Sequence, residues 1–220
     1  MKPIIFSTPM VQAILDGKKT QTRRVVKING YLITSPKESL ELTKEGLIYH
    51  SFCSMSGYYK PLCQPGDILW VRETWAKRVY SDNRYYYKAD DNLGAIFNRE
   101  GDKWRPSIFM PREAARIFLK VTNVRVERLQ EITAEDVIRE GIKYSDSGPY
   151  HWHVLDTKLN AWINFHFHDE AFKHLWDSLN AKRGYGWDMN PWVWVIEFEA
   201  TNSGRQEREN KTINNLSKDE

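Results

Sequence analysis

Apolar residues recur along the chain with two different periods, which predicts a mixture of helices and strands over the first 200 residues. Apolar residues at helical spacing, preceded by capping residues and followed by glycine, predict helices over residues 9–16, 133–141 and 169–182. Runs rich in β-branched and aromatic residues predict strands over residues 68–72, 85–89, 115–127 and 191–198. This combination indicates an α+β fold, with helices packed at the ends of a small barrel.

Two local signals refine this pattern. The polar run 18–24 contains two threonines, follows the first helix directly, and is expected to leave it as an extended strand. In the predicted strand 115–127, the apolar positions change parity near Thr122 and Asn123. A bulge at this point would curve the strand into a barrel.

The remaining segments carry weaker patterns. Residues 28–64 show no sustained period and are interpreted as an insertion with one weak hairpin, while residues 143–166 are interpreted as a loop region. Residues 201–220 lack aromatic residues and are expected to form a solvated, flexible tail. We therefore predict one domain over residues 1–200, followed by that tail.

Composition and charge narrow the classes of function. Hydrophobic residues make up 41% of the 220 positions, so disorder is not expected. The formal net charge is only +3, which argues against a protein that coats duplex nucleic acid and limits any such contact to local surfaces. Apolar runs are far shorter than the roughly 20 residues of a membrane span, and no secretion signal opens the chain. A cytoplasmic protein with no membrane role is expected.

Histidine pairs are the main candidates for a metal site. His151 and His153, and likewise His166 and His168, have a spacing that places both rings on one face of an extended segment. No carboxylates or cysteines accompany them at complementary spacing, so packing among aromatic residues is the favoured interpretation. Neither a metal nor a cofactor is predicted.

The residues Gly17-Lys18-Lys19-Thr20-Gln21-Thr22-Arg23, followed by Pro65-Gly66-Asp67 before the strand 68–72, resemble the opening of ASCH domains. Residues 104–111 and 183–197 resemble the phage-encoded branch of that family, so the similarity covers most of residues 3–200. The resemblance implies a PUA-like fold, which is a small mixed β-barrel with flanking helices and inserted loops, and which binds RNA or modified nucleotides. Relative to the compact enzymes of the family, the chain carries insertions near residues 28–64, 80–105 and 143–166.

One branch of the ASCH family that the chain resembles consists of amidohydrolases that remove the acetyl group from N4-acetylcytidine with a lysine, a threonine and a glutamate. The resemblance places these catalytic residues at Lys19, Thr22 and Glu140. In this hypothesis Lys19 activates the Thr22 hydroxyl, provided that burial or neighbouring cations lower the pKa of the lysine. Glu140 would hold Lys19 or orient the attacking water. Taken singly, each residue also fits an ordinary solvated turn, strand or helix end.

Five further residues are candidates for substrate binding. Arg23, Arg24 and Arg72 can bind phosphate through their guanidinium forks, or can form salt bridges at the rim of the barrel, for instance with Glu73. Both interpretations stay open. Trp75 is a better candidate than Trp70 for stacking on a base, because Trp70 lies inside an apolar run that predicts core packing.

Three functions are compatible with these residues. The leading hypothesis is a metal-independent amidohydrolase acting on an N4-acylated cytidine or a related modified base. The alternatives are a non-catalytic module that binds RNA or modified bases, and a ribonuclease whose basic loop stabilises the cleaved phosphate. In each case the partner is a modified nucleoside or a single-stranded nucleic acid.

Overall fold

The chain divides into two units. The computed structural model describes residues 1–28, 31–32, 39–43, 46–51, 57–77, 84–90 and 103–201. Unit 1 comprises Met1–Gly17, Gly66–Lys120 and Glu199–Glu220, and unit 2 comprises Lys18–Pro65 and Val121–Phe198. The two longest strands, β11 (Phe118–Arg128) and β15 (Trp192–Thr201), run from one unit into the other.

Unit 1 contains a strand ladder and a short hairpin. Its elements are β1 (Lys2–Ile5), α1 (Thr8–Leu15), β8 (Ile68–Arg72), β9 (Trp75–Lys77), β10 (Tyr85–Tyr87), η1 (Ser107–Phe109), η2 (Arg112–Ala114) and the start of β11. Strand β8 pairs in parallel with β1 and antiparallel with the start of β11, and β9 pairs antiparallel with β10. Aromatic side chains from β8, β9 and β10 form its core together with Met110 and Phe118.

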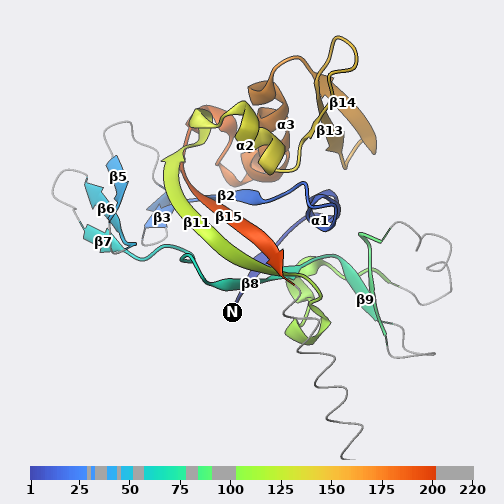
Figure 1. Ribbon diagram of the computed structural model, residues 1–220, viewed down its shortest axis with the longest axis horizontal. Coiled ribbons are helices and arrows are strands. Elements are labelled where there is room, and N and C mark those ends of the chain that lie inside the picture. Colours follow the sequence, from blue (N-terminus) through green and yellow to red (C-terminus); the bar gives the residue numbers. More distant parts are fainter. Residues whose placement is uncertain are drawn as a thin grey trace, which may run out of the picture. The chain divides into compact units, whose positions relative to one another are not determined.

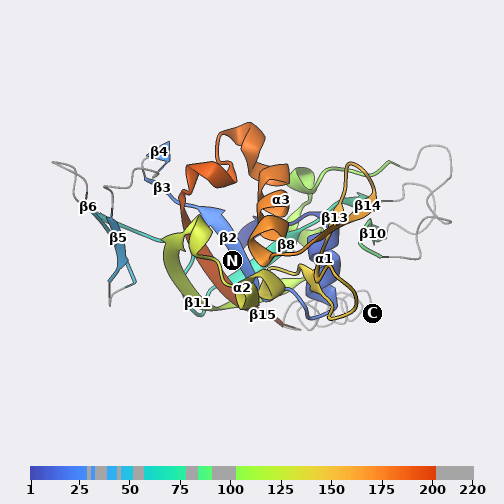
Figure 2. The same ribbon diagram turned by 90° about the horizontal axis from the view of Figure 1, so that it is seen from above.

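Unit 2 contains two helices and most of the remaining strands. Its elements are β2 (Gln21–Val25), β3 (Lys27–Ile28), β4 (Tyr31–Leu32), β5 (Ser39–Leu42), β6 (Ile48–Ser51), β7 (Gly57–Tyr59), the rest of β11, η3 (Leu129–Glu131), α2 (Ala134–Arg139), β12 (Lys143–Tyr144), β13 (Trp152–Asp156), β14 (Ala161–Phe165), α3 (His168–Asn180), η4 (Ala181–Arg183), η5 (Trp187–Met189) and most of β15. Within this unit, β15 pairs antiparallel with β2. Figures 1 and 2 show α2 and α3 on one side of β2 and β15.

Capping and burial explain why α2 and α3 form where they do. The Thr133 side chain accepts a hydrogen bond from the backbone N–H of Asp136 (3.2 Å), and acidic residues occupy the first turn of α2. Gly141 follows the helix with a φ of 93°, a conformation that favours glycine. Helix α3 buries Phe172 and Trp176, one turn apart, against valines of β13 and β15.

The helices and strands that the sequence predicts are present in the structure. The three predicted helices are α1, α2 and α3, and the predicted strands 68–72, 85–89 and 191–198 are β8, β10 and β15. In β11, Val121 and Val124 are buried whereas Thr122 and Asn123 between them are exposed. The predicted change of face in this strand is therefore confirmed.

The interpretation of residues 143–166 as a loop region is wrong. They form the antiparallel sheet β12-β13-β14, in which Trp152 pairs with Phe165. Trp152 and Val154 are buried at the period of a strand, but aromatic and histidine residues also occupy the other positions, so the alternation of apolar and polar residues is hidden. Residues 28–64 likewise hold more than one hairpin, because β5, β6 and β7 form a three-stranded sheet.

The described residues establish a mixed α+β structure, as predicted. The single domain and its three insertions stay predictions, and parts of those insertions lie outside the described residues, as do residues 202–220 of the expected tail. In the part of the chain that the structure describes, no helix combines the length and the apolar character needed to cross a membrane.

The cap of α2 gives a direct test of this local analysis. Thr133→Ala removes the hydrogen bond that the threonine side chain accepts, and we expect the free energy of unfolding to fall by about 1 kcal/mol in urea denaturation. Ser7→Ala is the matched control, because Ser7 caps α1 without a side-chain hydrogen bond and its loss is expected to cost less than about 0.5 kcal/mol. Equal losses in the two variants would contradict the capping role of Thr133.

Candidate active site

Lys19 precedes β2 in a segment that backbone hydrogen bonds tie to two other elements of unit 2. The N–H of Thr20 donates to the carbonyl of Arg139 at the end of α2 (2.9 Å), and the carbonyl of Thr20 accepts from the N–H of Phe198 in β15 (2.8 Å). Lys19 Nζ consequently reaches the end of α2, where it donates to Oε2 and to the backbone carbonyl of Glu140, both at 2.7 Å. The structure therefore joins two of the three predicted catalytic residues.

This ion pair is buried. The Lys19 side chain is 0% exposed and that of Glu140 is 4% exposed. Burial lowers the pKa of Lys19, the charge of Glu140 acts in the opposite direction, and the charges of Arg24 and Arg23 add to the lowering. The net effect places the pKa of Lys19 below the ordinary lysine value of 10.5. A lysine with a lowered pKa meets one requirement for a general base.

Arg23 on β2 is enclosed by three carboxylates. Its Nη2 donates to Glu127 (2.5 Å) and to Asp136 (2.8 Å), and its Nη1 donates to Glu140 (3.2 Å). The Arg23 side chain is only 1% exposed. Because both terminal nitrogens already bind carboxylates, Arg23 stabilises the packing of β2, β11 and α2 in this structure. Contact between Arg23 and a substrate phosphate stays a prediction.

Arg125 of β11 extends this network toward solvent. It donates to Glu127 (3.0 Å), to both carboxylate oxygens of Asp136 (3.2 and 3.0 Å) and to Glu197. Burial alone would raise the pKa of Asp136, but the charges and hydrogen bonds of Arg23 and Arg125 override it and lower that pKa. The carboxylate of Asp136 is thus held in its charged form between two arginines.

Gln21 completes the network from within β2. Its side chain is fully buried. In the amide orientation that satisfies its hydrogen bonds, it donates to Asp136 (3.0 Å) and accepts from Arg125 (3.1 Å) and Arg23 (3.2 Å). A neutral amide therefore fills the space between the charged groups and forms hydrogen bonds with three of them.

Thr22 and Arg24 point to the face of β2 opposite Gln21 and Arg23, because side chains alternate along a strand. Arg24 Nη1 donates to Thr22 Oγ1 (2.7 Å) and to the carbonyl of Arg23 (2.9 Å). Thr22 is buried. The charge of Arg24 also lowers the pKa of Lys19. A position of Thr22 beside Lys19 stays a prediction.

Arg72 and Glu73 lie in unit 1, at the end of β8, and each has partners there. Arg72 Nε donates to the carbonyl of Met110 (3.1 Å). Both carboxylate oxygens of Glu73 accept from Arg116, at 2.9 and 3.0 Å. Burial raises the pKa of Glu73, and the hydrogen bonds and charge of Arg116 oppose that rise. The salt bridge of Glu73 is thus formed with Arg116, and substrate contacts of Arg72 and Glu73 stay predictions.

Trp75 on β9 is covered by its neighbours. The side chain is 4% exposed, its ring centroid lies 5.8 Å from that of Tyr85, and the Arg105 guanidinium carbon lies 5.1 Å from the ring centroid. A base can stack on Trp75 only after one of these neighbours moves, so this stacking also stays a prediction.

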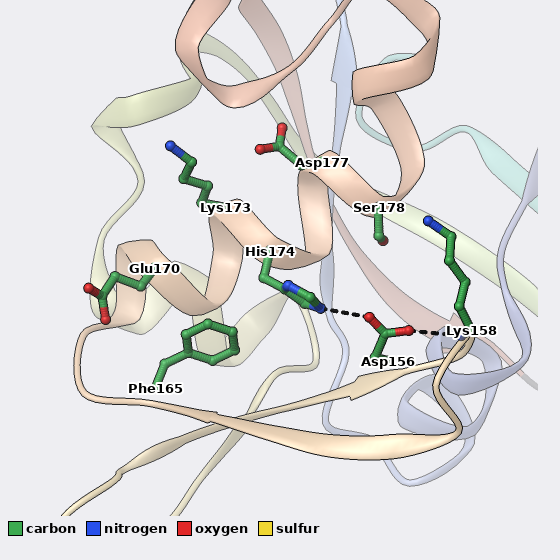
Figure 3. A pocket seen from close by; sticks show the side chains of 8 residues that line it. All are labelled: Asp156, Lys158, Phe165, Glu170, Lys173, His174, Asp177 and Ser178. Carbon is green, nitrogen blue, oxygen red and sulfur yellow. Dashed lines mark hydrogen bonds and ion pairs between the residues drawn. The ribbon is translucent and has the colours of Figure 1, made fainter.

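A groove of about 570 Å³ opens beside α3 and the hairpin β13–β14 (Figure 3). Within it, His174 Nε2 lies 3.0 Å from Asp156 Oδ2, while the backbone N–H groups of Lys158 and Leu159 donate to Asp156 Oδ1 and lower the pKa of that carboxyl. The nearby Ser178 hydroxyl donates to the carbonyl of Leu175 in its own helix rather than to His174. The pair therefore orients an imidazole but presents no activated nucleophile.

Sequence reasoning missed Glu127 and Asp136 beside Arg23, and it missed the pair His174–Asp156. Arg125 and Glu127 alternate on one face of β11, and Asp136 sits in the capping turn of α2, but neither spacing indicates a shared partner on β2. His174 lies on a helix and Asp156 on a strand, so no local period links them. Within the described ranges, no group of three or more His, Cys, Asp and Glu side chains is arranged to hold a metal ion.

No family model matches the chain, and no curated protein or solved structure matches it either. The resemblance to ASCH domains consequently depends on the motif residues themselves.

The Arg23 network predicts a large effect of a conservative substitution. Asp136→Asn keeps the shape of the side chain but removes a charge from the buried arginine, and we expect a loss of about 3 kcal/mol in the free energy of unfolding. Glu135→Gln is the matched control on the same helix. Its carboxylate is 73% exposed and pairs only with Arg139 one turn away, so a loss below about 0.5 kcal/mol is expected.

The difference in stability between wild type and Asp136→Asn should depend on pH, and the sign of this dependence follows from the pKa of Asp136. Because folding lowers the pKa of Asp136, its ionisation stabilises the native state above the unfolded-state pKa of about 3.9, and this stabilisation disappears as the pH falls through the lower folded-state value. The stability gap between wild type and Asp136→Asn should therefore be full at neutral pH and should shrink below about pH 4. A gap that is independent of pH would show that the charge of Asp136 is not what stabilises unit 2.

Proposed function

We propose that the chain is an amidohydrolase that removes the acyl group from N4 of an acylated cytidine or a related modified base. The proposal includes a PUA-like barrel of the ASCH type and uses Lys19, Thr22 and Glu140 as the working residues. The observation that carries it is the buried contact between Lys19 and Glu140, at 2.7 Å, in a loop whose residues resemble those of the ASCH amidohydrolases.

Lys19 is suited to act as the general base. A lysine accepts a proton only in its neutral form, and burial favours that form by lowering the pKa of Lys19. Glu140 opposes this effect and holds the Nζ atom in place through its carboxylate and its carbonyl. The two contacts together support a base whose position is defined and whose pKa is still lowered.

Thr22 is suited to act as the nucleophile. Its Oγ1 accepts a hydrogen bond from Arg24, which leaves the hydroxyl hydrogen available to a base. The positive charge of Arg24 also stabilises the negative charge that develops on Oγ1 as the proton departs.

The reaction then proceeds in two balanced steps. Neutral Lys19 takes the proton of Thr22, Oγ1 attacks the acyl carbon, the bond from that carbon to N4 breaks, and Lys19 returns the proton to the departing amine. The products of this step are cytidine and an acyl ester on Thr22. Lys19 then takes a proton from water, which attacks the ester carbon. The bond from that carbon to Oγ1 breaks, Lys19 returns the proton to Oγ1, and the carboxylic acid leaves. These residues supply every proton transfer, so the proposed mechanism uses no metal.

The proposal is tested by incubating pure protein with N4-acetylcytidine and following free cytidine by chromatography. We expect turnover by wild type and a loss of roughly 10²- to 10⁴-fold in kcat for Lys19→Arg, which keeps the positive charge beside Glu140 but cannot act as a base. Lys18→Ala, at the exposed neighbouring position, is the control and should retain wild-type turnover.

The alternatives give different results in the same experiment. Turnover that survives in Lys19→Arg would exclude Lys19 as the base. Absence of cytidine at high protein concentration would favour a binding module, and shortened RNA in a parallel incubation would favour a ribonuclease.

A pH profile tests the role of Glu140. If neutral Lys19 is the base, kcat/KM should rise with pH and level off above a midpoint that lies below 10.5. The Glu140 charge raises the pKa of Lys19, so any activity left in Glu140→Gln should rise at a lower pH than in wild type. A midpoint that is unchanged or shifted to higher pH would show that Lys19 is not the titrating group.

A further inference from the structure

The sheet β12-β13-β14 has one buried and one exposed face. Trp152 and Val154 of β13 point toward α3 and are buried in the core of unit 2. The strand registers place a different set on the opposite face, in two rows across the sheet: Lys143, His153 and Asn164 in one row, and Leu155 and Trp162 in the other. We call these five residues the outer face.

Trp162 is the dominant side chain of the outer face. It is 57% exposed, and its strand partner Leu155 is partly buried beside it. The Lys143 ammonium lies 5.7 Å from the centroid of the Trp162 ring. A large aromatic surface thus faces solvent, with a cation over its ring.

The row beside Trp162 presents hydrogen-bonding groups. His153 Nδ1 lies 2.7 Å from Asn164 Oδ1. In the tautomer that carries a proton on Nδ1, His153 donates to the amide oxygen of Asn164, which leaves the amide N–H₂ as a donor and Nε2 of His153 as an acceptor. A donor and an acceptor side by side match the edge of a nucleobase.

We propose that the outer face binds a single-stranded segment of nucleic acid, with one base stacked on Trp162 and a backbone phosphate near Lys143. The edge of a stacked or neighbouring base would be contacted by Asn164 and His153. This inference deepens the proposed function and depends on it for the choice of partner class, because it adds a modified base within a polymer to the free nucleoside as a substrate.

Charge favours a nucleic acid over a protein partner. The outer face carries Lys143 and no carboxylate, because Asp156 points to the other face of the sheet and binds His174 there. Base stacking on an exposed aromatic ring is tolerant of sequence and contributes much of the affinity for single strands. A protein partner would require a larger apolar area than one tryptophan and one leucine provide.

The outer face is also close to the candidate active site along the chain. Glu140 ends α2, Gly141 turns with a φ of 93°, and Lys143 begins β12. All of these residues belong to unit 2, as do Lys19 and Thr22. The same compact unit therefore carries the proposed catalytic residues and the surface proposed to hold the strand.

The test measures binding of unmodified, fluorescein-labelled 12-nucleotide RNA and DNA single strands by fluorescence anisotropy at low salt, so that no turnover is needed. Trp162→Ala should weaken binding by roughly five- to 150-fold, the range expected for loss of one stacked base. Trp162→Phe should largely restore it. Lys143→Gln should reduce the slope of log Kd against log salt by about 0.7, as for one phosphate contact on a single strand.

Phe109→Ala is the control for loss of an exposed aromatic ring, because Phe109 is 70% exposed and lies in unit 1. It should bind both strands like wild type.

Equal affinity of wild type and Trp162→Ala, or no binding of either strand by wild type, would overturn the inference, and the outer face would then be a site for another partner class. Wild type that binds through Trp162 but forms no cytidine from N4-acetylcytidine, and releases no acetate from an oligonucleotide containing it, would keep this inference and overturn the proposed function. Hydrolysis of N4-acetylcytidine by wild type, with strand binding that does not change in Trp162→Ala, would keep the proposed function and overturn this inference.

Discussion

The arrangement of unit 2 depends on the burial of Arg23 among Glu127, Asp136 and Glu140. An arginine that is 1% exposed is strongly destabilising unless its hydrogen bonds go to charged partners, and here the partners come from β11 and from α2. The ion pairs of the two terminal nitrogens of Arg23 therefore hold helix α2 against strands β2 and β11. It also brings Glu140, at the end of α2, to the segment that carries Lys19.

The contact between Lys19 and Glu140 combines two opposing electrostatic effects. Burial favours the neutral amine, while the carboxylate favours the ammonium ion, and the balance leaves the pKa of Lys19 below its ordinary value. A purely structural ion pair has no need of a neutral lysine, whereas a catalytic base requires one. The conservative substitutions at Lys19 and Glu140 separate these two roles because they change charge and basicity independently.

Much of the architecture follows from local signals in the chain. Thr133 and Gly141 mark the ends of α2, and the spacing of Phe172 and Trp176 predicts the buried stripe of α3, because caps and helical periods act within a few residues. The change of face at Thr122 and Asn123 is likewise predicted from the sequence, because the period of a strand is a local pattern. The candidate catalytic residues Lys19, Thr22 and Glu140 were proposed from a motif, and the structure joins the first and the last of them.

Only the tertiary structure decided which groups surround the candidate catalytic residues and Arg23. The carboxylates that hold Arg23 are more than 100 positions away from it in the chain, and no period or spacing encodes such a contact. The sheet β12-β13-β14 was hidden because aromatic residues occupy both of its faces, so the hydrophobic pattern does not show which face is buried. The sequence by itself determined the three helices, the strands β2, β8, β10, β11 and β15, and the basic loop before β2. Long-range packing decided the burial of Lys19 and the exposure of Trp162, since both depend on which elements cover them.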